Sequence, residues 1–337
     1  MSDSLVELTD QGLYCPAGGF HIDPWKDVDR AVITHAHGDH ARRGSRSYLA
    51  AEAGRGLLEA RLGDVRLETR PYGEAVDING VRVSFHPAGH VLGSAQVRIE
   101  YRGEVWVVSG DYKLADDPTC LPFEPVRCDT FITESTFALP IYRWERSGDI
   151  FHQINAWWRA NRDAGRASII FAYSLGKSQR ILAGVDASIG PIITHAAVEN
   201  LNRAYRATGV KLPETALVSE TAKGKAFAGA LVIAPPSAEG SAWQKRFEPA
   251  STAVASGWMQ VRGARRRRSA DRGFVLSDHA DWPGLLEAVS LTGASRVLAT
   301  HGSAGVLARW LREHGLDAGV IATRFGDEDD VAGGEAS

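Results

Sequence analysis

Ile33-Thr-His-Ala-His-Gly-Asp-His-Ala-Arg42 places three histidines and an aspartate within six residues, directly after an apolar run. Neutral imidazoles and carboxylates are ligands that zinc, iron and manganese accept. The apolar run is typical of the end of a buried strand, and the glycine permits a sharp turn. In an extended chain His35 and His37 point the same way, whereas Asp39 and His40 lie past the turn. The segment therefore predicts a site for two divalent metal ions; the alternative is a solvated, charged turn.

The composition limits the kinds of protein that this chain can be. Its 337 residues are enough for about two domains with buried cores, and its net charge is −3. Nucleic-acid binding would therefore depend on a local basic patch. The three cysteines (Cys15, Cys120 and Cys128) have no paired ligand spacing, which indicates reduced thiols. Met1–Leu8 lacks the features of a signal peptide and no apolar stretch has the length of a membrane helix, so we expect a soluble, cytoplasmic protein with no membrane partner.

The order of strand-like and helix-like segments divides the chain into an interrupted domain and an inserted one. Residues 1–136 contain many short strands, and Arg102-Gly103 predicts a hairpin turn. Residues 137–270 alternate strands with helices, which is typical of a parallel α/β unit. Strand-rich sequence returns over 271–326, and the acidic tail 327–337 is expected to be disordered.

The periodicity of apolar residues predicts the individual elements. The expected strands are Val81–Phe85, Ala95–Tyr101, Val105–Ser109, Thr130–Thr133, Ala167–Tyr173, Gly273–Ser277 and Arg296–Thr300. The expected helices are Asp149–Asn161, Lys177–Asp186 and Val198–Thr208. Two more helices are expected, one behind Asp281 with Pro283 in its first turn and one capped by Ser303.

Further apolar strands end in a histidine or an acid beside a small residue. His90 lies between glycines, Asp111 follows Val107-Val-Ser-Gly, and His301 follows Leu298-Ala-Thr. Strand ends are where rigid scaffolds present chemical groups, and the two oxygens of one aspartate can bridge two metals. A lone histidine of this kind is usually structural, but the joint occurrence of these residues indicates one shared site.

These motifs resemble the metallo-β-lactamase superfamily. His35-Ala-His-Gly-Asp-His40 matches its signature, His90 and Asp111 match its later ligand motifs, and Asp23 resembles its first acidic motif. The resemblance implies an α/β (α+β) fold, the αββα sandwich, formed by 1–136 and 271–326 with 137–270 inserted.

The resemblance narrows to the β-CASP nuclease branch of this superfamily. Glu134, His279 and His301 look like its motifs A, B and C. A histidine at motif C departs from the Artemis and Pso2 members and favours a complete two-metal site. Three segments are similar to bacterial DNA ligase-associated exonucleases, which are encoded with a ligase and a helicase: Gly89–Ala95, Tyr173–Gln179 and Ser256–Met259.

The resemblance also implies a ligand set for two divalent ions, whether zinc, manganese or iron. His35, His37 and His90 would hold one ion, Asp39, His40 and His301 the other, and Asp111 would bridge them. Two ions about 3.5–4 Å apart can clamp a phosphodiester.

Four acidic or histidine residues receive catalytic or orienting roles by the same resemblance. Asp39 would orient the attacking hydroxide, and Asp23 a ligand histidine. His279 would protonate the leaving oxygen while Glu134 holds its ring. The alternatives are a capping acid for Glu134 and a surface-loop histidine for His279.

Residues for nucleic-acid contact can be chosen from the turn after one strand and from one basic run. Ser174 and Lys177 flank a turn between a strand and a helix, where backbone amides and an ammonium can bind phosphate. Arg265, Arg266, Arg267 and Arg268 form the strongest basic run. An ordinary turn and a solvated loop are the alternatives, and Trp258, which could stack a base, is more often a core residue.

Together these features predict a metal-dependent DNA nuclease, a 5′-to-3′ exonuclease of DNA repair that acts on single-stranded DNA or a free end. An RNA-processing nuclease of the same fold is the first alternative. A small-ester or lactam hydrolase is the second, against which Glu134, His279 and His301 argue. A catalytically silent nucleic-acid-binding subunit is the third, against which the intact ligand set argues.

Replacement of Arg265, Arg266, Arg267 and Arg268 by glutamine is expected to weaken nucleic-acid binding and to flatten its salt dependence. Each lost phosphate contact removes about 0.7–0.9 from the slope of log K against log salt concentration. Binding of a labelled single-stranded oligonucleotide over a salt series measures this slope. An unaltered slope would support the solvated-loop interpretation.

Overall fold

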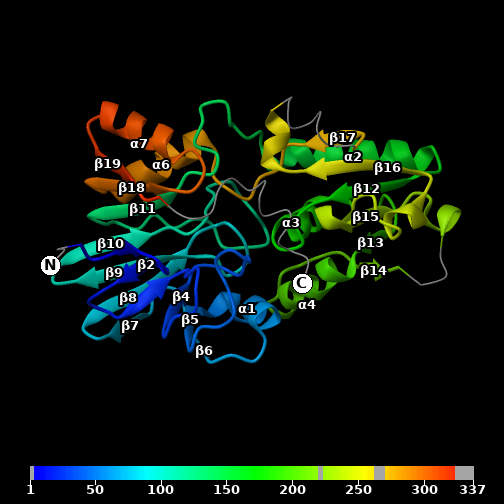
Figure 1. Cartoon of the computed structure of the whole chain (residues 1–337). Helices are drawn as coiled ribbons and strands as arrows, with labels where there is room; N and C mark the ends of the chain where they lie inside the picture. The colour runs from blue at the N-terminus through cyan, green and yellow to red at the C-terminus, as the bar shows by residue number, and fades with distance from the viewer. Residues whose placement is uncertain (1–3, 219–222, 262–269, 323–337) are drawn as a thin grey trace.

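Three β-sheets and their flanking helices make up the computed structural model, which describes residues 4–218, 223–261 and 270–322 (Figure 1). The first sheet, in the order β1-β2-β3-β4-β5-β6, contains Glu7–Thr9, Gly12–Cys15, Phe20–Ile22, Ala31–Ile33, Tyr48–Ala51 and Leu67–Arg70. The second, in the order β19-β18-β11-β10-β9-β8-β7, contains Asp317–Val320, Arg296–Thr300, Thr130–Glu134, Glu104–Val108, Ala95–Tyr101, Val81–Pro87 and Ala75–Ile78. The third, in the order β14-β13-β15-β12-β16-β17, contains Ala216–Leu217, Ile192–Thr194, Leu231–Ala234, Ala167–Phe171, Ala250–Ala255 and Arg272–Phe274.

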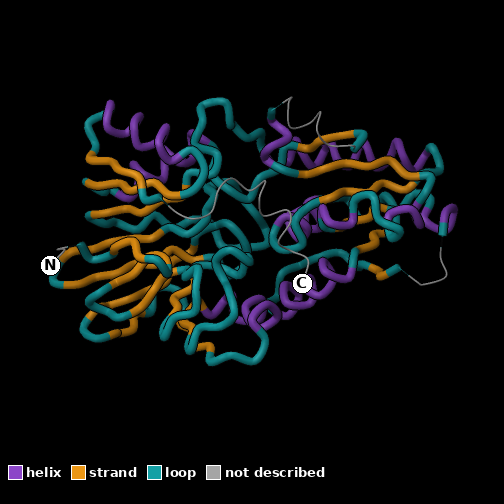
Figure 2. Tube along the Cα trace, viewed as in Figure 1, coloured by secondary structure: helices purple, strands orange, loops and turns teal. Residues whose placement is uncertain are grey.

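The helices cover the outer faces of these sheets (Figure 2). The α-helices are Arg55–Leu62 (α1), Ser147–Asp163 (α2), Lys177–Gly184 (α3), Ala196–Ala207 (α4), Trp282–Thr292 (α6) and Ala304–Glu313 (α7). Short 3₁₀ segments are Glu52–Gly54 (η1), Gly224–Phe227 (η2), Pro236–Ala238 (η3), Gln244–Phe247 (η4) and Gly257–Gln260 (η5).

The first two sheets pack face to face and form the inner layers of a four-layer sandwich. Val32 of β4 and Ile132 of β11 belong to one buried cluster between the sheets. Their neighbours along the strands point outward, because side chains alternate along a strand. Ile33 packs against α1, and Phe131 packs against α6 and α7. The predicted αββα sandwich is therefore confirmed.

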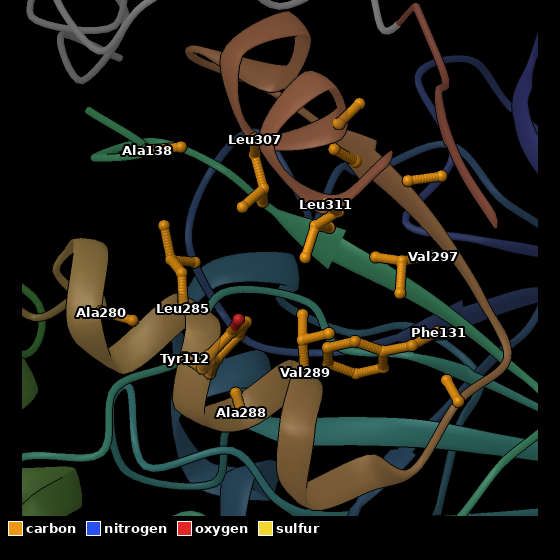
Figure 3. Close-up of a cluster of buried hydrophobic side chains, with 14 of the residues drawn as sticks. Tyr112, Phe131, Ala138, Ala280, Leu285, Ala288, Val289, Val297, Leu307 and Leu311 are labelled. Carbon is orange, nitrogen blue, oxygen red and sulfur yellow. The ribbon is translucent and has the colours of Figure 1, made fainter. Parts of the chain in front are cut away.

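The outer face of the second sheet is covered by the two C-terminal helices (Figure 3). Leu285 and Val289 of α6 and Leu307 of α7 lie against Phe131 and Val297 of the adjacent strands β11 and β18. Full burial of such a side chain stabilises the fold by about 1.5–3 kcal/mol. This packing fixes β11 and β18 side by side, and both strands lead to predicted site residues.

The third sheet belongs to the inserted segment and is all-parallel in the described residues. One face is covered by α2, α3 and α4, where Trp158 is fully buried and donates its indole N–H to Gly229 O at 2.9 Å. The other face is covered by 3₁₀ segments through residues such as Phe247 and Met259. These layers agree with the predicted parallel α/β unit.

The pairing of strands in the third sheet favours a domain boundary later than the expected one at residue 270. β17 (Arg272–Phe274) pairs with β16 in the third sheet, although the sequence assigned residues from 271 to the sandwich. The apolar run Gly273–Ser277 was expected to be one strand of the sandwich. Only its start is a strand, and that strand belongs to the third sheet. We propose that the inserted domain extends from residue 137 through Phe274. The tail 327–337 lies outside the described residues.

Most local predictions are confirmed, with ends shifted by a few residues. Arg102-Gly103 joins β9 to β10 with positive φ angles of 52° and 86°, as a tight hairpin requires. Asp281 caps α6 by accepting from Gly284 N at 2.9 Å. The predicted cap at Ser303 is wrong: the residue precedes α7, but its ψ of 43° lies outside the extended region and its hydroxyl makes no capping bond.

A substitution at Gly93 tests how closely the loop after β8 approaches the start of α1. A Cβ at Gly93 would lie 2.1 Å from Gly54 Cα, and its φ is +75°. Gly93→Ala is expected to cost about 1–3 kcal/mol for the backbone conformation and about 1–3 kcal/mol more for displaced backbone. Gly73→Ala is the control, because Gly73 has a φ of +77° and nothing within 4 Å of such a Cβ. Urea unfolding measures both, and equal losses would contradict the prediction.

Candidate metal centre

The predicted site residues gather at one edge of the sandwich because parallel strands end there. β10, β11 and β18 run parallel, and Asp111, Glu134 and His301 lie at or just beyond their C-terminal ends. β3 and β4 are also parallel, and Asp23 and the segment 35–40 follow them. The two sheets therefore supply opposite walls of one site.

Four of the predicted ligands present atoms to a common centre. His37 Nδ1 lies 3.1 Å from His35 Nε2 and 3.0 Å from His90 Nε2. Asp111 Oδ2 lies 3.5 Å from His35 Nε2 and 3.8 Å from His90 Nε2. Tetrahedral zinc ligands at about 2.0–2.1 Å from the metal are about 3.3 Å apart. The donor set and its spacing therefore fit a divalent cation.

The remaining predicted ligands lie on the other side of Asp111. His40 Nε2 is 3.4 Å from Asp39 Oδ2 and 3.4 Å from Asp111 Oδ2. His301 lines the same cavity as these three residues, with its ring centre 6.1 Å from that of His40. Asp111 Oδ2 thus contacts histidines of both groups, which is the position that a bridging ligand needs.

Each of the five histidines has a polar partner at its other ring nitrogen. His40 Nδ1 lies 2.7 Å from Asp23 Oδ2, and His90 Nδ1 lies 2.7 Å from Asp278 O. The other contacts are His35 Nδ1 to Thr34 Oγ1 (3.0 Å), His37 Nε2 to Leu175 O (3.3 Å) and His301 Nδ1 to Thr300 Oγ1 (2.8 Å). Such partners fix the ring orientation and the tautomer, which leaves the inner nitrogen as a ligand atom.

Burial and neighbouring charges set the protonation of these groups. Burial, helped by the other imidazoles, lowers the pKa of His35 and of His90 well below the usual value, so both rings are neutral at pH 7. Burial would lower the pKa of His40 too, but Asp39, Asp111 and Asp23 outweigh it and raise that pKa. The same surplus of negative charge favours a bound cation at this position.

Glu134 and His279 form a buried pair beside the ligand cluster. His279 Nδ1 lies 2.9 Å from Glu134 Oε2, and Tyr112 N donates to Glu134 Oε1 at 2.7 Å. Ligand atoms of Glu134, His279 and Asp111 lie within 4.8 Å of one another. Burial raises the pKa of Glu134 and Asp111 adds to this effect, while His279 acts in the opposite direction. The two residues that the sequence linked as acid and orienting partner are therefore in contact.

Two of the predicted site residues adopt left-handed backbone conformations. Asp23 has a φ of 44° and His301 a φ of 58°, and both are among the four such non-glycine residues in the described part of the chain. This conformation is costly for residues with a Cβ and is concentrated at functional sites. The fold therefore aims both side chains at the site against local preference.

Thr34, which no sequence motif identified, links Asp23 to the candidate ligands. Thr34 N and Oγ1 donate to the two oxygens of Asp23 at 2.8 and 2.5 Å, and Oγ1 also contacts His35 Nδ1. A hydroxyl residue between a buried strand and the first ligand was the available signal.

The turn that was predicted to contact phosphate lies against the ligand cluster. Ser174 and Lys177 flank Leu175, whose carbonyl contacts His37. Both side chains are buried, and Lys177 Nζ lies 3.8 Å from Asp278 Oδ2, which is beyond hydrogen-bond distance.

The predicted nucleic-acid contacts at the basic run and at Trp258 remain. Arg265–Arg268 lie outside the described residues. Trp258 is half-buried and packs on Phe137 with ring centres 4.8 Å apart, in agreement with a packing role.

Several known proteins are similar to this chain. A probable DNA ligase of Opitutus terrae is 33% identical over 317 residues, which cover 92% of this chain and 30% of that protein. The endoribonuclease YSH1 of Yarrowia lipolytica is 31% identical over 125 residues, 36% of this chain and 15% of that protein. The cleavage and polyadenylation specificity factor 73 of Drosophila melanogaster is 31% identical over 123 residues, 36% of this chain and 18% of that protein. The chain belongs to the β-CASP nuclease branch of the metallo-β-lactamase superfamily.

The β-CASP chain spans less than a third of the length of each of these relatives.

A solved structure of a protein of unknown function from Enterococcus faecalis has the same fold, with a TM-score of 0.63 at 11% identity over 88% of this chain and 79% of that one. No protein-family model matches the chain. Among the described residues, none of the helices combines the length and the apolar character needed to cross a bilayer.

Asp23→Asn tests the outer contacts of the β-CASP metal centre. Loss of the carboxylate beside His40 is expected to weaken metal binding about 10–100-fold, because the ring loses the partner that fixes its tautomer. Competition with a chromophoric zinc chelator measures the affinity. Asp64→Asn is the matched control, since Asp64 is an exposed surface residue. Equal affinities in the two variants would refute this role for Asp23.

Proposed function

We propose that this protein is a two-metal phosphodiesterase that hydrolyses DNA from the 5′ end and acts in DNA repair. The main support is one observation: seven candidate metal ligands, four of them buried, converge beside the Glu134–His279 pair. A lactam hydrolase on this fold would have no need of that pair, whereas transfer of a proton to a leaving oxygen does.

In this proposal the ligand assignments are those that the sequence predicted. His35, His37 and His90 would hold one metal, Asp39, His40 and His301 would hold the other, and Asp111 would serve both. Bound divalent cations there, whether zinc, manganese or iron, supply positive charge that stabilises the phosphate oxygens and makes water more acidic.

The protein's own groups orient the reactants and move the proton. Asp39, whose pKa is lowered by His40 although burial opposes this effect, stays ionised and can accept a hydrogen bond from the attacking water. Glu134 holds His279 Nδ1, so the ring keeps one orientation. His279 then protonates the leaving oxygen of the sugar.

Lys177 and Ser174 are proposed to bind a backbone phosphate beside the scissile one. Among the described residues, the Lys177 ammonium and the Ser174 hydroxyl make no hydrogen bond, although both side chains are buried. Lys177 Nζ has an ion pair with Asp278 at 3.8 Å and lies 4.6 Å from the centre of the Tyr173 ring. A buried ammonium with unused donors is costly, and a phosphate oxygen would satisfy it. Arg265–Arg268 are proposed to follow the backbone of the strand.

The similarity to a protein named DNA ligase over 92% of this chain supports DNA as the substrate and a functional link to a ligase. A link to a helicase is proposed from the family resemblance alone. RNA processing remains the second candidate, because the other relatives include proteins named endoribonuclease. Three free cysteines agree with a cytoplasmic location.

Cleavage assays with the purified full chain test the proposal. The substrates are 5′-labelled and 3′-labelled single-stranded DNA and matched RNA, each with Mn²⁺, Zn²⁺ or EDTA. We expect mononucleotides from the DNA 5′ end with metal only, none with Asp39→Ala, and a rate about 10²–10⁴-fold lower with His279→Ala. Asp64→Asn is the control for the substitutions.

Three outcomes would contradict the proposal. Cleavage confined to RNA would assign the protein to RNA processing. Binding of DNA by wild type and by Asp39→Ala, without cleavage under any metal, would support a silent subunit. Hydrolysis of nitrocefin or a thioester without nuclease activity would support a small-molecule hydrolase.

A further inference from the structure

A closed ring of buried polar contacts lies directly behind His90. The His90 carbonyl accepts from Lys113 Nζ at 2.8 Å, and Lys113 Nζ pairs with Asp117 Oδ2 at 2.8 Å. Asp117 Oδ2 lies 3.6 Å from Arg180 Nε, an ion pair beyond hydrogen-bond distance, and Arg180 Nη1 lies 3.2 Å from Asp278 Oδ1. The Asp278 carbonyl completes the ring at His90 Nδ1, 2.7 Å away.

The ring joins the two domains. Lys113 and Asp117 belong to the sandwich loop that carries Asp111, whereas Arg180 lies on α3, the helix of the inserted domain that faces the sandwich (Figure 1). Arg180 also donates to Ser277 O at 2.5 Å and to Ser147 Oγ at 2.7 Å. One guanidinium thereby ties the start of α2 and the segment before α6 to the loops of the candidate metal centre.

The four charged side chains of the ring are each no more than 4% exposed. Ionised groups taken out of water are costly unless they are paired, so a ring of alternating charge sets the position of each member narrowly. Burial would raise the pKa of Asp117, but Lys113 and Arg180 outweigh it and lower that pKa, so the carboxylate is ionised. The metal chemistry itself requires none of these four groups, so their burial here needs another explanation.

Gly89 is independent evidence that the loop of His90 is held against Lys113. Lys113 Nζ also donates to Gly89 O at 2.6 Å, and a Cβ at Gly89 would lie 2.4 Å from Lys113 O. The backbone before His90 therefore approaches the Lys113 segment more closely than another residue would permit. The carbonyl and the outer nitrogen of His90 are both fixed by members of the ring.

We propose that Lys113, Asp117 and Arg180 are positioning residues for His90, through which the seating of the inserted domain controls the affinity of one metal position. Arg180 holds Asp278, Asp278 holds the His90 ring, and Lys113 holds the His90 backbone. The inference rests on the proposed ligand assignments, in which His90 serves one metal and not the other. Loss of the ring therefore weakens one metal and spares its neighbour.

The test compares metal binding by the full chain with Arg180→Met, Arg180→Lys and the control Arg206→Met. Arg206 is the matched control because it forms a half-buried ion pair with Glu199 on α4, a pair within the inserted segment that has no part in the ring. Calorimetric titration of the metal-stripped proteins with Zn²⁺, supported by Co²⁺ absorption spectra, resolves the two binding steps. Circular dichroism in EDTA establishes that each variant is folded.

For Arg180→Met we expect one binding step to weaken about 10–100-fold, as for loss of an outer contact to a ligand, while the other stays unchanged. Arg180→Lys should recover part of the loss, and Arg206→Met should bind both metals as the wild type does. Excess metal should restore the activity of Arg180→Met on whichever nucleic acid the wild type cleaves. A merely structural role would lower thermal stability without separating the two steps.

Asp117→Asn keeps the inference testable if Arg180→Met does not fold, because the amide has the same size and removes only the charge. It is expected to weaken the same step as Arg180→Lys. Two unchanged binding steps in folded Asp117→Asn and Arg180→Lys would overturn the inference, even if the protein proves to be a DNA exonuclease. Selective loss of one step would support it even if no DNA is cleaved.

Discussion

The constraint on which this structure depends is the burial of many ligand lone pairs in one place. Imidazole nitrogens 3.0–3.1 Å apart, next to a carboxylate, cannot all be protonated, and water has little room to solvate them. A cation satisfies them together. The fold supplies what this arrangement needs: parallel strand ends that share an edge, a polar partner for every outer nitrogen, and two left-handed residues, Asp23 and His301, that local preference alone would not produce.

The part of the site that could be predicted was encoded locally. The spacing within residues 35–40, and histidines or acids after apolar strands, are visible in short segments, and parallel strands bring such segments together without further information. The β11 and β18 strands were expected with nearly their observed bounds. The resemblance to a family supplied the roles of Glu134 and His279, which no spacing rule would have paired across 145 residues.

The part that could not be predicted depends on long-range burial. Lys113, Asp117 and Arg180 look like ordinary surface charges in the sequence, and contacts between segments far apart in the chain bury them. The pairing of β17 with β16 was hidden for a similar reason, because an apolar run does not reveal which sheet it joins. The cap at Ser303 was wrong because a suitable residue type does not guarantee extended backbone.

The direct pairing of β11 with β18 sets the order in which the site is assembled. The Ser135 hydroxyl donates to Thr300 O across 165 residues, so a whole domain occupies the crossover between two neighbouring parallel strands. During synthesis from the N-terminus, His35, His37, His90 and Asp111 emerge long before His279 and His301. A nascent chain therefore has the residues proposed to hold one metal while it still lacks the histidine proposed to protonate the leaving group. The carbonyls that hold the outer nitrogens of His37 and His90, those of Leu175 and Asp278, also emerge later, so the geometry of the site is complete only when β18 has joined the second sheet.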